Sequence, residues 1–307
     1  MHHQNHIFRG GLAIIIASFL WGTTGTAASF TPNVSPLATG AFAMGVGGLL
    51  LVLSAFRELV TDSARLLGSY KLLLVGGLSV AIYPLAFYTS MRLSGVAIGT
   101  VLSIASAPFF TVMLECLISK KSVSKRWLLS FAVGVIGIVM LAMGKVNNTG
   151  YDTQLLSHYL GMLLGLVAGL TYALYSWAAK CMIDVGINSK SAMSSMFALA
   201  AFLLLPSLLF TGDNLFISTG NSLVVIYMAI VPMFFGYVLF GYGLNYVEAS
   251  QATLITLLEP AVATIMAVLI VGERFSAIGW LGIGLIMVCL LLQISNRPST
   301  TKALALV

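Results

Sequence analysis

The sequence predicts an all-α, polytopic membrane protein with ten transmembrane helices, arranged as two inverted repeats of five helices. Hydrophobic residues make up 59% of the 307-residue chain and charged residues only 8%, against about 25% charged residues in a typical soluble domain. The apolar residues form ten separate runs of about 20 residues, the length that an α-helix needs to cross a bilayer. A sequence pattern from the first half also recurs in the second half.

The first five apolar runs are joined by short connections. The first run begins after Arg9 and is too long for the apolar core of a cleaved signal peptide, so we expect it to be retained as a span. We expect the first five spans at Gly10–Phe30, Pro36–Phe56, Leu72–Ser90, Val96–Ile118 and Leu128–Met143.

A polar segment, Gly144–His158, separates these spans from a second group of five. It is the longest connection in the chain and is too short to form another folded domain. We therefore take residues 1–145 and 159–296 as the two five-helix repeats. The second five spans are expected at Tyr159–Met182, Ser191–Phe210, Leu223–Tyr242, Ser250–Val271 and Ala277–Ile294.

Lys and Arg are distributed unevenly between the loops of the two membrane sides. If the N-terminus is cytoplasmic, the outer loops hold only Arg92, Lys145 and Arg274, and the other twelve of the fifteen basic residues lie inside. Cytoplasmic loops are enriched in Lys and Arg, so both termini are predicted to be cytoplasmic. Because these residues lie at helix ends, the net charge of +6 does not indicate nucleic-acid binding.

An internal repeat relates the two halves. Ala97–Ala142 aligns without a gap to Ala249–Ile294, and this alignment places Pro108 on Pro260. A unit with an odd number of spans enters the membrane from opposite sides in its two copies. This inverted arrangement is typical of transporters that bind their substrate near the bilayer midplane.

Glu259 and Pro260 lie near the middle of the ninth span. A carboxylate at the bilayer centre costs at least about 2.5–3.5 kcal/mol, so Glu259 needs a partner, water or a proton. Pro260 cannot donate a hydrogen bond to the Thr256 carbonyl, so we expect that carbonyl to be free and the helix to bend there. Ser250, Thr253, Thr256 and Glu259 form one polar stripe. The carboxyl group either binds substrate or a coupling proton, or joins neighbouring helices as a structural group.

The fourth span carries hydroxyl groups but no acid at the equivalent position, which is Ala107. Ser103 is a candidate substrate-binding residue in a polar wall opposite Glu259, although hydroxyls of membrane helices often bond to their own backbone. Pro108 and Pro260 are predicted hinges. Glu115 lies near the end of this span, and we expect it to pair with Lys120 or Lys121.

Several aromatic side chains lie at mid-span positions, away from the interfacial belts where Trp and Tyr usually gather. A buried phenol or indole needs a hydrogen-bond partner, which favours a polar cavity, although simple helix packing is an equal alternative for each residue. The predicted substrate-binding residues are Trp21, Tyr83, Ser103, Tyr172, Tyr237, Thr256 and Glu259.

The chain lacks the motifs of the main enzyme and motor classes. It has no phosphate-binding G-x-x-x-x-G-K-[ST] motif and no H-E-x-x-H metalloprotease motif. Cys116, Cys181 and Cys289 show no metal-ligand spacing, and His158 is the only histidine beyond the N-terminus. We therefore expect no enzymatic activity, no cofactor and no metal site.

The order of several short motifs resembles that of the EamA branch of the drug/metabolite transporter superfamily. The motifs are Leu20-Trp21-Gly22, Leu257-Leu258-Glu259-Pro260, Gly272-Glu273-Arg274 and Gly279-Trp280-Leu281-Gly282. The resemblance covers nearly the whole chain. It implies a carrier of the bacterial inner membrane, commonly an exporter of amino acids or related metabolites, with a cavity among helices one, three, four, six, eight and nine. Many relatives have an arginine in the second span, whereas Leu37–Leu53 has no charge, which disfavours an anionic substrate.

We therefore predict a secondary transporter that carries a small-molecule substrate through the lipid bilayer by alternating access, with protons as one candidate coupling ion. The alternative from another class is a non-transporting membrane factor, either a lipid-modifying enzyme or an assembly scaffold. A channel is disfavoured because no ring of charge or carbonyl-rich filter is present. Substrate, direction and coupling ion stay open, as does the oligomeric state, for which a homodimer is one arrangement.

Overall fold

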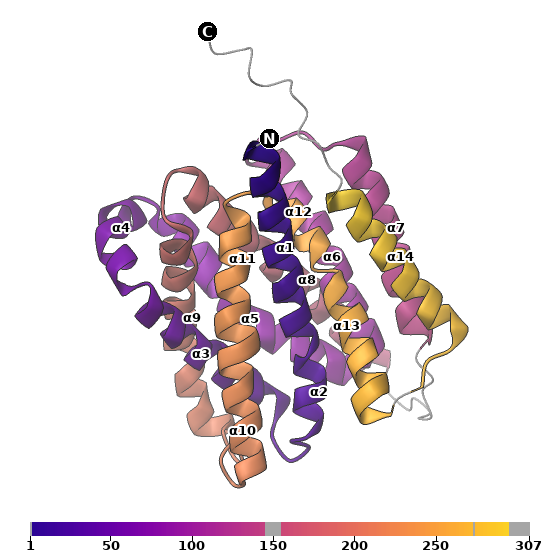
Figure 1. Ribbon diagram of the computed structural model, residues 1–307. Helices are drawn as coiled ribbons and strands as arrows, with labels where there is room; N and C mark the ends of the chain where they lie inside the picture. Colours follow the sequence, from indigo (N-terminus) through magenta and orange to yellow (C-terminus); the bar gives the residue numbers. More distant parts are fainter. Residues whose placement is uncertain (1, 145–154, 273, 295–307) are drawn as a thin grey trace.

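The computed structural model describes residues 2–144, 155–272 and 274–294, which are built from helices (Figure 1). The first half contains α1 (His2–Gly22), α2 (Thr24–Ser29), α3 (Pro36–Ser54), α4 (Phe56–Gly68), α5 (Tyr70–Ser94), α6 (Val96–Leu117) and α7 (Lys125–Gly144). The second half contains α8 (Leu155–Asp184), α9 (Ser189–Thr211), α10 (Thr219–Met228), the π-helix η1 (Ala229–Phe235), α11 (Gly236–Leu244), α12 (Ala249–Ile255), α13 (Leu258–Met266), the π-helix η2 (Ala267–Val271) and α14 (Ala277–Ile294).

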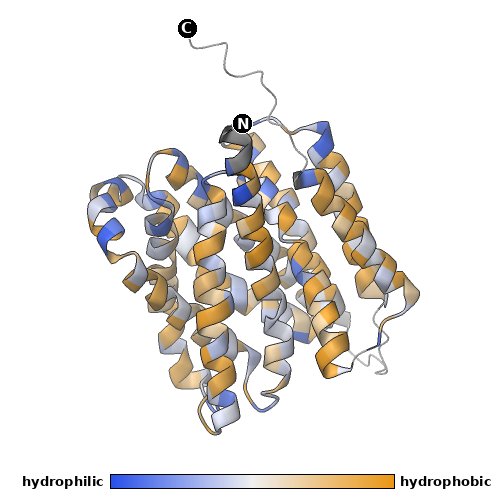
Figure 2. Ribbon diagram, viewed as in Figure 1, coloured by the Kyte–Doolittle hydropathy of each residue, from blue (hydrophilic) through white to orange (hydrophobic). Residues whose placement is uncertain are grey.

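The helices have the lengths and composition of membrane spans. In the part of the chain that the structure describes, nine helical segments are long and apolar enough to cross a membrane, and α14 is a shorter apolar helix. Large apolar side chains remain exposed on the outside, such as Leu209 and Phe210, which are 85% and 87% exposed. Figure 2 shows the most hydrophilic residues mainly near the ends of the helices. The predicted polytopic helical fold is confirmed.

Packing between the two halves follows a two-fold pseudo-symmetry. The first span, α1, packs against α11 and α13 of the eighth and ninth spans, and the sixth span, α8, packs against α5 and α6 of the third and fourth. The second span, α3, pairs with the seventh, α9, and the fifth, α7, pairs with the tenth, α14. Each of these contacts between a span of the first half and a span of the second half therefore has a symmetry-related counterpart.

Equivalent helices of the two halves run in opposite directions. The Lys121 Nζ, which precedes α7, lies 3.1 Å from the carboxylate of Asp184 at the end of α8. At the other end of the molecule, Ser276 N before α14 donates to the Gly144 carbonyl at the end of α7 (2.9 Å). Figure 1 accordingly shows α1 beginning at the end where α14 finishes. This is the geometry of an inverted repeat.

Helix α4 was not predicted from the sequence, which placed a loop between the second and third spans. Its carboxylate Asp62 accepts a hydrogen bond from Asn188 N (3.0 Å), and Arg65 donates to the Gly186 carbonyl (2.9 Å). Glu58 on the same helix pairs with Lys190 Nζ (3.0 Å). The helix was missed because its apolar residues cover only one face, so its charges resemble those of a loop.

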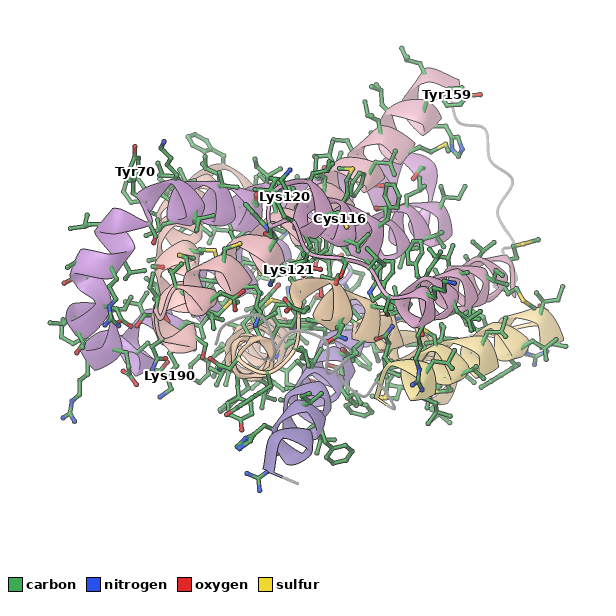
Figure 3. All side chains as sticks on the ribbon, turned by 90° about the horizontal axis from the view of Figure 1, so that it is seen from above. Tyr70, Cys116, Lys120, Lys121, Tyr159 and Lys190 are labelled. Carbon is green, nitrogen blue, oxygen red and sulfur yellow. The ribbon has the colours of Figure 1, made fainter. Side chains whose placement is uncertain are left out.

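A charged cluster joins the two halves at the end of the molecule that carries α4. Lys121 Nζ lies 2.5 Å from Glu248 and 3.1 Å from Asp184, and Lys180 Nζ lies 3.1 Å from Asp184. Burial alone would lower the pKa of Lys121, but the hydrogen bonds and charges of Glu248 and Asp184 raise it above its ordinary value. Viewed from this end, Lys121 lies near the middle of the molecule and Lys190 at its margin (Figure 3).

Glu115 does not form the lysine pair that its sequence position suggested. Among the described residues, its carboxylate accepts a hydrogen bond from Ser250 N (3.0 Å) in the first turn of α12. Free N–H groups and the positive end of the helix dipole stabilise an acid at this position. Lys121 is instead held by Glu248, the residue that precedes α12.

Candidate functional site

The ninth span is broken directly before its acidic residue. Helix α12 ends at Ile255 and α13 begins at Leu258, so Glu259 lies in the first turn of a new helix. In contrast to the prediction, the Thr256 carbonyl is not left free, because Glu259 N donates to it (3.0 Å). Because Pro260 has no N–H group for the usual i to i+4 hydrogen bond, the turn tightens and Glu259 N forms an i to i+3 hydrogen bond instead.

The first span is also broken, at the level where it meets Glu259. Helix α1 ends at Gly22 and α2 begins at Thr24. A Cβ atom on Gly22 would lie 2.6 Å from the Val262 Cβ and 2.9 Å from the Glu259 carbonyl oxygen. Gly22 is therefore required for the close approach of the first and ninth spans.

The eighth span contributes a widened turn at the same level. Pro232 has no N–H group, and the surrounding residues 229–235 form the π-helix η1. The Pro232 carbonyl accepts a hydrogen bond from the Trp21 indole Nε1 (2.8 Å). Irregular backbone within the membrane is tolerated where it lies inside the protein or lines a cavity.

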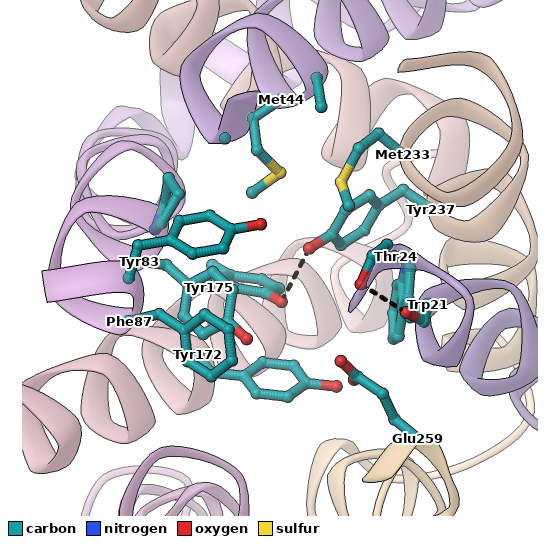
Figure 4. A pocket seen from close by; sticks show the side chains of 14 residues that line it. Trp21, Thr24, Met44, Tyr83, Phe87, Tyr172, Tyr175, Met233, Tyr237 and Glu259 are labelled. Carbon is teal, nitrogen blue, oxygen red and sulfur yellow. Dashed lines mark hydrogen bonds between the residues drawn. The ribbon is translucent and has the colours of Figure 1, made fainter. Parts of the chain in front are cut away.

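These breaks surround a cavity between the two halves (Figure 4). Its volume is about 50 Å³, enough for a few waters. The spans that line it are the first, second, third, sixth, eighth and ninth. The lining residues are Trp21, Thr24, Gly40, Ala43, Met44, Tyr83, Pro84, Phe87, Tyr88, Tyr172, Tyr175, Met233, Tyr237 and Glu259.

Aromatic rings form a continuous wall of this cavity. The ring centroids of Tyr172 and Tyr175 lie 5.1 Å apart, and Tyr83 lies 5.6 Å from Tyr172. On the opposite side, the Trp21 and Tyr237 rings are 4.8 Å apart. These spacings are those of favourable offset and edge-on aromatic pairs.

The polar ends of several rings are held by the protein. The Tyr172 hydroxyl donates to Thr256 Oγ1 (2.8 Å), and the Tyr175 and Tyr237 hydroxyls share a hydrogen bond (3.2 Å). Together with the Trp21 indole, these contacts fix the orientation of four rings. Only a few polar groups are left to contact a solute, as in many small-molecule sites.

Among the described residues, Glu259 is the one carboxylic acid that lines the cavity, and its carboxylate points into it (Figure 4). The side chain is partly buried, and within the described residues it has no hydrogen bond or ion pair. None of the lining residues that the structure describes is Lys, Arg or His. An acid in this position can bind a proton or a cationic group of a solute.

The structure brings together five of the seven predicted site residues. Trp21, Tyr83, Tyr172, Tyr237 and Glu259 line the cavity. Thr256 lies behind Tyr172, from whose hydroxyl it accepts a hydrogen bond, and is itself buried.

Ser103 is placed elsewhere. Its hydroxyl donates to the Gly99 carbonyl of its own helix (2.7 Å), and its carbonyl lies 2.7 Å from the position of a Cβ on Gly169. The small residues of α8 thus draw α6 onto α8 and away from the cavity. The second span lines the cavity where the family resemblance implied the fourth.

The predicted hinges differ in their surroundings. Pro108 lies inside α6, which continues from Val96 to Leu117. Pro260 lies in the first turn of α13, next to the break, and lines a second, mainly apolar cavity together with Thr26 and Thr264. Their role as hinges stays a prediction.

Other cavity residues were not chosen as candidates from the sequence. Tyr88 was missed because the third span was expected to end at Ser90, whereas α5 continues to Ser94 and places Tyr88 deeper. Met44 and Met233 resemble ordinary apolar span residues, so the sequence offers no signal for them. Tyr175 lies three residues after Tyr172 in the same span but was not among the predicted site residues.

Comparison with known proteins identifies the family. The model of the EamA-like transporter family matches residues 8–143 and 159–295. The uncharacterized transporter YwfM of Bacillus subtilis (strain 168) is 32% identical over 295 residues, covering 95% of each chain. A probable amino-acid metabolite efflux pump of Escherichia coli (strain K12) is 26% identical and covers 81% of this chain and 84% of its own.

A solved crystal structure shares the fold, with a TM-score of 0.74 at 17% identity, over 92% of this chain and 95% of the other. The helical fold, the two matched repeats and the transporter relatives agree, and they set aside the lipid-modifying enzyme that the sequence had left open. The chain is a multi-pass membrane protein and belongs to the EamA-like transporter family.

Proposed function

We propose that this protein is a secondary transporter that exports amino acids or related small metabolites across the bacterial inner membrane by alternating access. The two repeats, residues 1–145 and 159–296, would rock against each other around the central cavity. The basic end with α4 would face the cytoplasm, in accordance with the excess of Lys and Arg there.

The observation that carries this proposal is the position of the cavity. It lies between the two inverted halves, beside breaks in the first and ninth spans, and the carboxylate of Glu259 points into it. Inverted repeats, broken helices and a site at the repeat interface are features that alternating-access transporters share. The direction and the substrate class rest on the E. coli relative named as a probable efflux pump.

Glu259 is proposed to bind a substrate amine or a coupling proton, and Trp21, Tyr83, Tyr172 and Tyr237 to shape the site. In reconstituted vesicles, Glu259→Gln should lower the transport rate at least tenfold and flatten its dependence on pH, because the amide can neither ionise nor bind a proton. Glu58→Gln, at a half-buried position on α4 outside the cavity, is the matched control and should transport normally. An unchanged rate and pH profile in Glu259→Gln would exclude the proposed role.

The substrate itself is found by comparing metabolites released from cells with and without the protein, and then by transport in vesicles. A non-transporting assembly scaffold predicts no difference in either measurement. Orientation is tested separately by labelling single cysteines introduced in place of Lys190 and Arg92, which lie at opposite ends. Labelling of Lys190→Cys from outside intact cells would reverse the proposed orientation.

A further inference from the structure

The charge content of the cavity restricts the solutes that it can hold. Glu259 is the one carboxylic acid among the described lining residues, and none of these residues is basic. A zwitterionic amino acid would bring its carboxylate into a space of low dielectric that already holds an acid and offers no cationic side chain. Such a carboxylate would lose its hydration and be repelled by Glu259.

The aromatic rings that line the cavity with Glu259 are suited to a positive charge. Trp21, Tyr83, Tyr172, Tyr175 and Tyr237 line the cavity, and neighbouring rings lie 4.8–6.2 Å apart. Aromatic faces attract ammonium groups, most strongly where water is excluded, and clusters of such rings recognise quaternary ammonium ligands.

The rings are also fixed in place. The indole of Trp21 is bound to the Pro232 carbonyl, the hydroxyl of Tyr172 to Thr256, and the hydroxyls of Tyr175 and Tyr237 to each other. The rings that a cation would contact are therefore already oriented, which lowers the cost of ordering side chains, while the space between them admits only a few waters in this conformation.

We propose that the cavity selects organic cations, with a primary or quaternary ammonium group held between Glu259 and the aromatic wall, over zwitterionic amino acids. This inference rests on the proposed function, since it names the substrate class of the same site. The expected substrates are then decarboxylated or otherwise cationic relatives of amino acids, and not the zwitterionic amino acids themselves.

Binding to the purified full-length protein tests the inference without requiring transport. Two matched ligand pairs are measured by calorimetry: phenethylamine against phenylalanine, which adds a carboxylate, and choline against 3,3-dimethyl-1-butanol, which lacks the charge. We expect the cation of each pair to bind at least tenfold more tightly. Equal or tighter binding of phenylalanine, or of the uncharged alcohol, would overturn the inference, as would the absence of binding by either cation.

Variants distinguish the contribution of the Glu259 charge from that of the Tyr83 ring, and both from a loss of folding. Glu259→Gln should weaken the binding of both cations at least tenfold. Tyr83→Leu should weaken choline binding severalfold. Tyr159→Leu makes the same change at an exposed tyrosine of α8 that does not line the cavity, and should leave choline binding unchanged. Thermal unfolding identifies any variant that has lost its fold. Unchanged choline binding in a folded Tyr83→Leu protein, or in folded Glu259→Gln, would contradict the proposed contacts.

Transport measurements with the same ligands distinguish this inference from the proposed function. If the cations bind in the expected order but the protein does not increase the passage of any of the four compounds across vesicle membranes, the proposed transport function is wrong and the cation site stands. If phenylalanine is bound and transported as well as phenethylamine, transport stands and the cation selectivity is wrong.

Discussion

At the residue scale, Gly22 determines how closely the first and ninth spans can approach. It follows Trp21 of the cavity wall and lies against the backbone of Glu259 and the side chain of Val262. Because one contact is with backbone and the other with a β-branched Cβ, neither can move aside easily. The geometry of the site thus depends on a residue that contributes no chemical group to it.

We expect Gly22→Ala to destabilise the protein by about 1–3 kcal/mol, since the added methyl group overpacks this crossing. Gly25→Ala, three residues later in α2, is the matched control because nothing lies within 4 Å of its Cβ position. Thermal unfolding of both purified variants in the same detergent measures the difference. Equal unfolding temperatures would show that the crossing is looser than the structure indicates.

At the scale of the element, α4 connects the two halves at the basic end. Its buried Asp62 accepts the backbone N–H of Asn188 at the start of α9, so the helix is attached to the turn between the sixth and seventh spans. The exposed pair of Glu58 and Lys190 lies on the same contact. Buried and exposed interactions therefore join the same two elements, and they should differ in strength.

Asp62→Ala should cost about 1–3 kcal/mol of stability, because it leaves the Asn188 N–H without its acceptor. Thr61→Ala, on the exposed side of the same helix turn, should change stability by no more than about 0.5 kcal/mol. Chemical denaturation of both variants provides the comparison. An Asp62→Ala protein as stable as Thr61→Ala would mean that α4 is not attached through this carboxylate.

The ion pair between Glu58 and Lys190 should make the stability of the folded protein depend weakly on pH. The hydrogen bond from Lys190 lowers the pKa of Glu58 below its usual value of 4.5. A lowered pKa means that the pair stabilises the folded protein above the unfolded pKa and loses this contribution as the pH falls through the folded value. Stability should therefore drop less between pH 6 and pH 3 in Glu58→Gln than in the parent protein, and an identical drop would exclude the contribution.

At the scale of the whole molecule, a symmetric frame holds an asymmetric site. The two halves pack through equivalent helix pairs, yet the acid occurs only in the second half, and Ala107 occupies the equivalent position in the first. Within the described residues the ends differ as well: the cluster of Lys121, Glu248 and Asp184 joins the halves at the basic end, and a backbone hydrogen bond from Ser276 to Gly144 joins them at the other. We expect this cluster to stabilise the conformation in which that end is closed.

Lys121→Met should open the basic end more often, since it leaves the acids of both second-half elements without their shared cation. Cys181 reports on this region because its sulfur lies 3.9 Å from the Ser119 hydroxyl, close to the cluster. In a protein carrying Cys116→Ala and Cys289→Ala, Lys121→Met should raise the rate of Cys181 labelling by a water-soluble maleimide severalfold. Lys190→Met breaks a peripheral ion pair and should leave that labelling rate unchanged. Equal rates in the two variants would show that the cluster does not hold the basic end closed.

The sequence alone indicated much of the site, for a simple physical reason. Mid-span Trp, Tyr and Glu are costly in lipid, so Trp21, Tyr172 and Glu259 were conspicuous among the apolar residues around them. Met44 and Met233 cost nothing in lipid, and nothing in the sequence distinguished them from residues of the outer face. Ser103 does not line the cavity, and its sequence position could not show this, because a hydroxyl can be satisfied by its own helix and gives no information on direction.

The sequence by itself determined the helical class, the positions of the spans and the inverted repeat, because a hydrocarbon layer requires long apolar helices and an odd repeat must reverse its direction. Only the tertiary structure decided where the spans break, which helices meet at the cavity and how α4 is attached. These features depend on contacts between distant residues, such as the Gly22 crossing and the hydrogen bond from Trp21 to the Pro232 carbonyl. Local sequence patterns do not specify which distant helix a span will pack against.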